Sequence, residues 1–138
     1  MSEGQTKHLE LIQGVIGRMA QNSFVMKGWA VTLVSAILVV AHKVAGWEYL
    51  LVALLPTFVF WGFDAFYLRQ ERLFRSLYDA VRRMGPDTWE NERFSLDPAP
   101  HSKGVSGWLR LCWSRSVVWL YGPMVLLIAS VAFYTAKC

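Results

Sequence analysis

One run, residues 47–84, constrains this chain more than any other stretch of its sequence. After Glu48 no charged residue occurs before Asp64, and from there the run mixes charged and apolar residues without a Gly or Pro to end a helix. At about 1.5 Å per residue, such a helix would reach roughly 55 Å, against about 30 Å of bilayer hydrocarbon. We therefore predict one helix that crosses a membrane over 48–67 and continues into the cytoplasm over 68–84.

Two further apolar runs, over 24–43 and 117–136, are each near the length that crosses a bilayer. Hydrophobic residues make up 54% of the chain and charged residues only 17%, a balance unusual in a soluble domain of this size. We therefore predict an all-α integral membrane protein with three transmembrane helices in the lipid bilayer. We expect the first run to stay in the mature protein, because a polar and amphipathic segment precedes it and no small-residue cleavage site follows it.

The Lys and Arg residues predict the orientation of these spans. The segment before the first span, with its rim, carries three of them, and the connection between the second and third spans carries nine. The short connection and the tail carry one each. Short segments rich in Lys and Arg stay in the cytoplasm. We therefore place the N-terminus and the long connection in the cytoplasm and the C-terminus outside.

The cytoplasmic segments have patterns of their own. Apolar residues recur at helical spacing in 1–23 and predict an amphipathic helix: Leu9, Leu11, Ile12, Val15, Ile16 and Met19. This helix could lie in the headgroup plane or pack on the apolar stripe of 68–84, and we favour the packing because that stripe also needs covering. A Gly-Pro pair then predicts a loop over 85–107. Residues 108–116 are expected to form an interfacial segment before the third span.

Asp64 is the one acidic residue within reach of the hydrocarbon, where an ionisable side chain is a functional candidate. Its place near the cytoplasmic end of the second span predicts an ion pair at the inner rim with Lys27, and Arg115 is a second candidate partner. We favour a structural ion pair over a proton relay, because no second acid lies deeper. The junction between span and cytoplasmic helix is the expected path of a signal, and its candidate residues are Trp61, Asp64, Arg69 and Arg72.

Small residues on the first and third spans predict self-association, because they let helix backbones approach closely. They are Gly28, Thr32 and Ser35 in the first span and Ala129 and Ser130 in the third. We expect a homo-oligomer whose subunit number these residues do not specify. Their hydroxyls would form only a thin polar stripe in a pore. A pore closed by a hydrophobic gate is therefore an alternative hypothesis.

Little in the chain supports catalytic or metal chemistry. The three His residues fall in different segments and the two Cys on opposite sides of the predicted membrane, so we expect no metal site, cofactor or disulfide. Acids after Met84 offset the arginines before it, so we expect anionic lipid rather than nucleic acid near the basic residues. Cys112 could accept a palmitoyl group, but we favour its interpretation as a small packing residue.

Two stretches, RMAQNSFVMKGWAVTL over 18–33 and FWGFDAFYLRQERLFRSLYDAVR over 60–82, resemble elements of a set of small bacterial membrane proteins. The order and spacing of the elements are similar, and the resemblance covers the chain up to Met84. It implies the inner membrane of a bacterium and no particular activity. The plan of a few spans with a cytoplasmic helical part is also similar to that of membrane-disrupting effectors of bacterial antiphage systems.

Three functions remain as hypotheses. We expect a non-enzymatic membrane effector or channel-like oligomer whose cytoplasmic helices sense a protein or a small ligand. The alternative is a membrane anchor or scaffold that recruits a soluble cytoplasmic protein. A transporter comes third, because secondary transporters normally have more spans and helices broken near mid-membrane.

Overall fold

The computed structural model describes residues 2–44, 48 and 51–137. Within these ranges the chain is helical, with connecting turns and no strand, so the predicted all-α class is confirmed for them. The long helices there are α1 (Glu3–Val44), α3 (Leu54–Arg83) and α6 (Arg115–Lys137). Between α3 and α6 lie α4 (Pro86–Asn91), the 3₁₀ helix η1 (Ala99–His101) and α5 (Trp108–Cys112).

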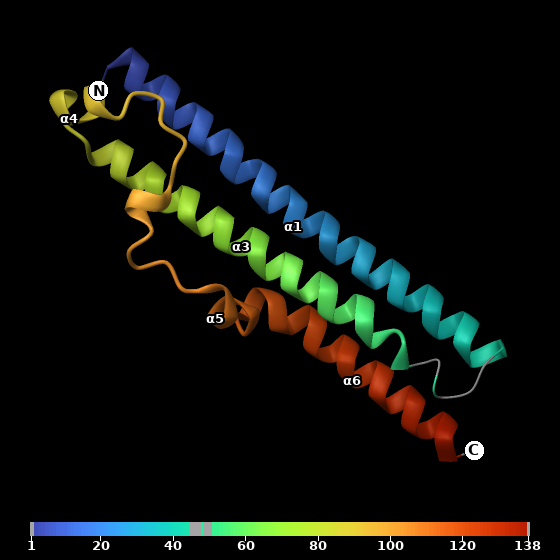
Figure 1. The fold of residues 1–138 in the computed structure, drawn as a ribbon. Helices are drawn as coiled ribbons and strands as arrows, with labels where there is room; N and C mark the ends of the chain where they lie inside the picture. Colours follow the sequence, from blue (N-terminus) through green and yellow to red (C-terminus); the bar gives the residue numbers. More distant parts are fainter. Residues whose placement is uncertain (1, 45–47, 49–50, 138) are drawn as a thin grey trace.

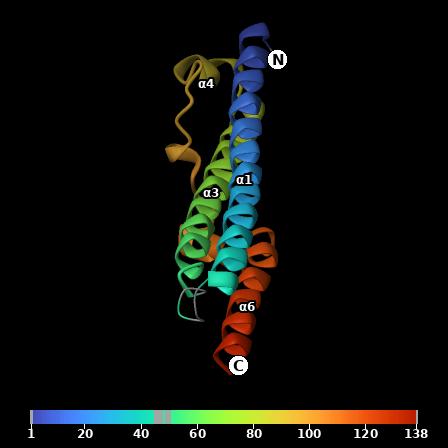
Figure 2. The same ribbon diagram turned by 90° about the vertical axis from the view of Figure 1, so that its right-hand side faces the viewer.

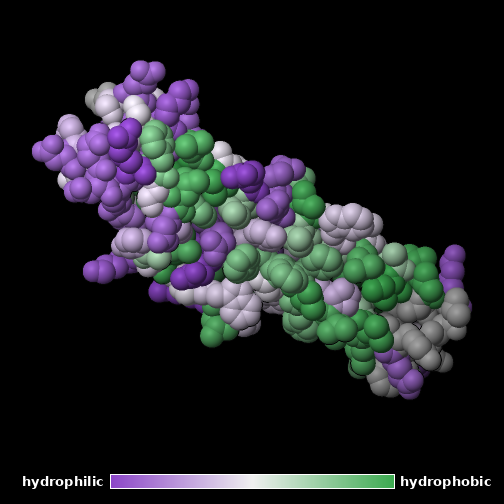
Figure 3. Space-filling model, turned by 45° about the horizontal axis from the view of Figure 1, so that its top comes forward, coloured by the Kyte–Doolittle hydropathy of each residue, from purple (hydrophilic) through white to green (hydrophobic). Residues whose placement is uncertain are grey.

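The molecule is elongated, with α1 and α3 side by side and α6 beside the first half of α3 (Figure 1, Figure 2). The chain between α3 and α6 runs back along α3, through α4, η1 and α5 (Figure 1). The N-terminus and α4 lie at one end and the C-terminus at the other. Figure 3 shows hydrophilic surface gathered at the end with α4 and mainly hydrophobic surface over the rest of the face in view.

The end that carries the N-terminus has an apolar core of its own, which we call the cap. It joins the start of α1, the end of α3 and α4, and its buried side chains are Leu9, Ile12, Ile16, Leu77, Val81 and Trp89. Both long helices contribute residues three or four positions apart, so each buries one stripe. The Gln5 amide donates to the carbonyls of Val81 (2.7 Å) and Met84 (3.2 Å) at the end of α3, where helix carbonyls lack the N–H partners of the helix interior.

The other end is a bundle of α1, α3 and α6. One buried layer there holds Ala30, Val117 and Tyr121, and the next holds Val34, Ala53 and Ile128. Large apolar side chains point outward from all three helices, including Phe24, Trp29, Leu55, Trp119 and Leu126, each at least 62% exposed. A surface of this kind favours lipid over water as its surroundings.

Two of the described helices are long and apolar enough to cross a membrane, α1 within Glu3–Val40 and α6 over Arg115–Lys137. The predicted second span, over 48–67, falls partly on α3, which is not among them. Since α3 begins only at Leu54, its apolar part before Asp64 is about 15 Å long, roughly half of the hydrocarbon thickness. The three-span arrangement therefore stays a prediction.

The expected continuous helix from Glu48 to Met84 is wrong in its first part, because Val52 and Ala53 form a turn. Pro56 gives the reason: it has no N–H for the carbonyl of Val52, and its ring would collide with that carbonyl in a continuous helix. Proline fits the first turn of a new helix. Thr57 completes that turn, since its N–H (3.4 Å) and its hydroxyl (2.8 Å) both donate to the Ala53 carbonyl.

Other boundaries also differ from those predicted. Residues 1–23 and 24–43 are not separate helices, because α1 runs without a break through both. Residues 85–107 are not a bare loop, since α4 and η1 lie within them. Pro86 occupies the first turn of α4, so the Gly-Pro pair that follows α3 also starts a helix. Within 108–116, α5 ends at Cys112 and α6 begins at Arg115.

Candidate functional site

The candidate site is the point where α1 and α3 bring a buried carboxylate and an amine together. Asp64 on α3 is fully buried, and Lys27 Nζ on α1 lies 2.5 Å from its Oδ2. The Ser23 hydroxyl, one turn before Lys27, donates to Asp64 Oδ1 and accepts a hydrogen bond from Lys27 Nζ at 3.0 Å. Both carboxylate oxygens therefore face a partner on α1, as a buried charge requires. The predicted pair of Asp64 and Lys27 is present.

The third helix closes this site. Tyr121 on α6 is fully buried, and its hydroxyl lies next to Asp64. Three helices thus converge on one carboxylate. The arrangement fixes how the helices sit relative to one another, and it offers no neighbouring acid to which a proton could pass. We name Ser23, Lys27, Asp64 and Tyr121 the buried polar junction.

Arg115, the second predicted partner of Asp64, does not take part. It lies in the first turn of α6 and is exposed, and no ion pair joins it to Asp64. The physical reason is the place of α6, which presents Tyr121 rather than its first turn to the carboxylate. Of the two candidate partners, Lys27 forms the ion pair with Asp64 and Arg115 does not.

Of the predicted coupling residues, Trp61 ties three helices together. Its indole N–H donates to the Cys112 carbonyl at the end of α5 (2.7 Å), and its ring stacks on Tyr121 of α6 with centroids 5.9 Å apart. A second indole, Trp108, donates from α5 to the Gly62 carbonyl (3.0 Å). Burial beside these rings raises the pKa of the Cys112 thiol above its ordinary value.

The other predicted coupling residues continue along α3 toward the cap. Arg69 is half-buried one turn after Asp64, and Arg72 is exposed. Neither residue contacts the carboxylate through an ion pair. The structure thus brings Trp61 and Asp64 into one packed region and leaves the two arginines outside it.

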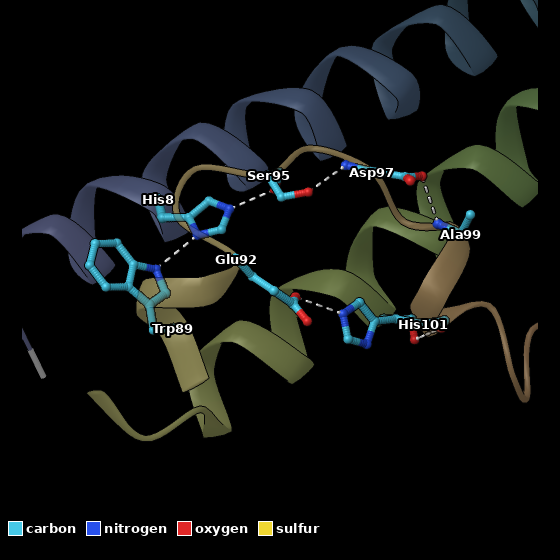
Figure 4. Close-up of polar contacts among 8 residues, drawn as sticks. His8, Trp89, Glu92, Ser95, Asp97, Ala99 and His101 are labelled. Atoms are coloured by element: carbon cyan, nitrogen blue, oxygen red, sulfur yellow. Dashed lines mark hydrogen bonds and ion pairs between the residues drawn. The ribbon is translucent and has the colours of Figure 1, made fainter. Parts of the chain in front are cut away.

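A polar network links α1 in the cap to the segment after α3 (Figure 4). His8 is fully buried, its Nδ1 accepts from the Trp89 indole N–H (3.0 Å), and its Nε2 lies 2.7 Å from the Ser95 carbonyl. Because the indole can only donate, Nδ1 must be the unprotonated nitrogen and Nε2 the donor to Ser95. Farther along, His101 Nε2 lies 3.3 Å from the Glu92 carboxylate.

The predicted association residues lie on the outside of the bundle. Gly28, Thr32 and Ser35 are exposed on α1, and Ala129 and Ser130 are exposed on α6. Val25, Gly28, Trp29 and Thr32 line a shallow hollow of about 280 Å³. The hydroxyls of Thr32 and Ser130 donate to carbonyls of their own helices, at 2.9 and 2.7 Å. They therefore reach no other helix within one copy of the chain.

Four buried polar residues were not predicted from the sequence, namely Gln5, His8, Ser23 and Tyr121. A signal for three of them was present, because Gln5 and His8 continue the face of Leu9 and Ile12 toward the N-terminus and Ser23 continues it toward Lys27. That signal is visible only when 1–44 is treated as one helix. Tyr121 had none, since a tyrosine in an apolar run looks the same whether it faces lipid or a carboxylate.

No metal-binding group of three or more His, Cys, Asp or Glu side chains exists within 2–44, 48 and 51–137. Comparison with protein-family models, curated proteins and solved structures found no match to this chain. The buried polar junction, the cap and the outward residues of α1 therefore have to carry the functional argument by themselves.

Proposed function

We propose that this chain is a non-enzymatic, three-span protein of the bacterial inner membrane that self-associates and acts as a membrane effector or channel-like oligomer, with the cap as its cytoplasmic sensing layer. One observation carries the proposal. Helix α1 runs unbroken from the cap, past the buried polar junction, to Val44. A displacement of the cap therefore moves the membrane part of α1 as one rigid element.

The packing of α3 supports the second of the three spans, over 48–67. Its apolar first third, residues 54–63, packs against both α1 and α6, the two helices able to cross a membrane. Helices that pack side by side lie at the same depth in a bilayer. If α1 and α6 cross the membrane, residues 54–63 of α3 therefore also lie in lipid. Its outward side chains agree, since Leu55, Phe58 and Phe63 are each more than half exposed. Asp64 then marks the inner boundary, and the basic residues that follow keep the cap in the cytoplasm.

The outward residues of α1 support self-association. Around Gly28 a Cβ atom would meet nothing within 4 Å, so the close approach that this glycine permits is not used by the chain's own helices. A second copy is the partner we propose, because small residues on lipid-facing positions let two helices pack backbone to backbone.

The test replaces Gly28 with a bulky residue that the single chain can accept. Gly28→Leu is expected to leave the folded monomer intact and to abolish assembly in lipid nanodiscs and dye release from liposomes. Gly17→Leu is the matched control, because it makes the same change on the same helix where a Cβ also meets no neighbour, but on the cytoplasmic side. Unchanged assembly of Gly28→Leu would reject this interface.

A membrane anchor or scaffold is the second candidate, and the polarity of the bundle favours it. The Thr57 hydroxyl is buried and donates to the Ala53 carbonyl, and Asp64 is paired on both oxygens, so these two buried polar groups already have partners within one copy. If the chain stays monomeric in nanodiscs and releases no dye, the anchor is the better function. A transporter would require Asp64→Asn to stop substrate movement without loss of folded protein.

A further inference from the structure

An open, cation-lined groove lies between the cytoplasmic half of α3 and the connection that follows η1. Two adjoining hollows form it, of about 320 and 410 Å³, and both are lined by Ser76, Asp79 and Lys103. Arg72 and Arg75 complete one hollow, and Arg83 completes the other. The groove forms because the chain returns along α3 after η1, as Figure 1 shows.

The positive charge of this groove is mostly uncompensated. Arg75 is held by Glu71, with Nη2 2.7 Å from Oε1, and Asp79 lies 3.5 Å from Arg82. In the part of the chain that the structure describes, no carboxylate comes within 4.0 Å of Arg72, Arg83 or Lys103. Cations gathered without counter-charges raise the local concentration of anions.

The far wall of the groove is anchored rather than loose. The Ser76 hydroxyl of α3 donates to the His101 carbonyl (2.5 Å), and the His101 ring lies 3.3 Å from Glu92. These contacts set Lys103 opposite the arginines of α3. A ligand would therefore meet cations from two segments already in position, which lowers the entropic cost of binding.

We propose that this groove binds a phosphate-bearing anion. Guanidinium groups match phosphate oxygens with two parallel hydrogen bonds, and an ammonium adds a point charge. Asp79 is the one acidic side chain in the lining, so the net field there is positive.

The depth of the groove favours a soluble phosphate over a lipid headgroup. Ser76 lies twelve positions after Asp64 on one helix, which is about 18 Å along its axis. Headgroups occupy only about 5–8 Å beyond the hydrocarbon on each side. This assignment rests on the proposed function only in taking Asp64 as the boundary of lipid.

The experiment titrates the full chain in a neutral detergent with inorganic pyrophosphate by calorimetry. Arg72→Gln and Lys103→Gln are each expected to weaken binding about tenfold, because each removes a charge-assisted contact. Asp79→Asn is expected to tighten binding, since it removes the opposing carboxylate. Arg93→Gln is the matched control, because Arg93 is paired with Glu90 away from the groove, and it should leave affinity unchanged.

Two results would overturn the proposal: no pyrophosphate binding by the unaltered chain, or equal losses in Arg93→Gln and Arg72→Gln, which would indicate unspecific attraction. The source of the phosphate is tested in nanodiscs. Equal pyrophosphate affinity in phosphatidylcholine alone and with added phosphatidylglycerol supports a soluble ligand, whereas competition by phosphatidylglycerol assigns the groove to a headgroup. Because binding in detergent requires no assembly, loss of self-association in Gly28→Leu leaves this measurement valid.

Discussion

The buried polar junction and the cap both join α1 to α3, but they do so with different chemistry. At the junction a fully buried carboxylate meets an amine whose side chain is 24% exposed, so the carboxylate without the amine is costly. In the cap the contacts are neutral: an imidazole, an indole, an amide and backbone carbonyls around an apolar core. The difference suggests that the junction fixes the position of α1, whereas the cap can open at a lower free-energy cost.

The largest effect should come from breaking the ion pair on one side only. Lys27→Met leaves Asp64 buried and unpaired, and we expect it to lower the free energy of unfolding by about 3–5 kcal/mol. Chemical unfolding in detergent micelles, followed by helical circular dichroism, measures the change. The double variant Lys27→Met/Asp64→Leu should recover most of the loss, since it removes both charges. A double variant no more stable than the single one would contradict this account of the junction.

A smaller loss is expected in the cap. His8→Leu keeps an apolar core but leaves the Trp89 N–H and the Ser95 carbonyl without their partner, at a cost of about 1–3 kcal/mol. Hydrogen exchange should rise in 86–101 and stay unchanged around Ser23 and Asp64. Equal exchange at both places would mean that the two regions open together, and the comparison would fail.

Two glycines of α1 test whether α4 docks on this helix. A Cβ on Gly4 would lie 2.6 Å from Cη2 of the Trp89 ring, so Gly4→Ala should destabilise the protein by about 1–2 kcal/mol. A Cβ on Gly14 would meet no atom within 4 Å, and Gly14→Ala should stabilise α1 by about 0.5–1 kcal/mol. Thermal unfolding of both variants measures whether the stability falls in Gly4→Ala and rises in Gly14→Ala. A Gly4→Ala variant as stable as Gly14→Ala would mean that α4 does not dock on α1.

The smallest effect concerns Cys112, whose carbonyl accepts a hydrogen bond from Trp61 close to the buried polar junction. Because burial raises the pKa of the Cys112 thiol, less thiolate is present at a given pH than for an exposed cysteine. In a Cys138→Ser background, alkylation by iodoacetamide at pH 8 should be slower than for Cys introduced at exposed Ser116. The rate at Cys112 should still be rising above pH 9. Equal rates at both positions would show that the rings around Cys112 do not shield it.

Local patterns in the sequence predicted the helical class and the pairing of Lys27 with Asp64. They also indicated the apolar faces of 1–23 and 68–84, and these faces supply the buried side chains of the cap. The two faces could be anticipated because helical periodicity is a property of neighbouring residues.

The wrong predictions concern features that depend on residues far apart in the sequence or on the effect of a proline. The turn before α3 depends on Pro56 acting on the carbonyl four positions earlier, which an apolar run conceals. The absence of Arg115 from the site and the presence of Tyr121 depend on how α6 packs, which no local pattern records. The bond of His8 to Trp89 joins positions 81 residues apart. Neither residue alone indicates it.

The α1 residues of the cap lie far along the chain from its α3 and α4 residues. This separation affects how the protein folds while it is being synthesised. The apolar face of α1 is synthesised early, but the α3 residues that cover it end near Val81, and Gln5 bonds to Met84, 79 positions later. Until that segment leaves the ribosome, the face has no protein partner and can rest on the membrane surface. If the chain is a membrane protein as proposed, surface binding and helix packing, two alternatives for the finished protein, would be successive stages of its assembly. The membrane itself would hold the first helix in place until its partner arrives.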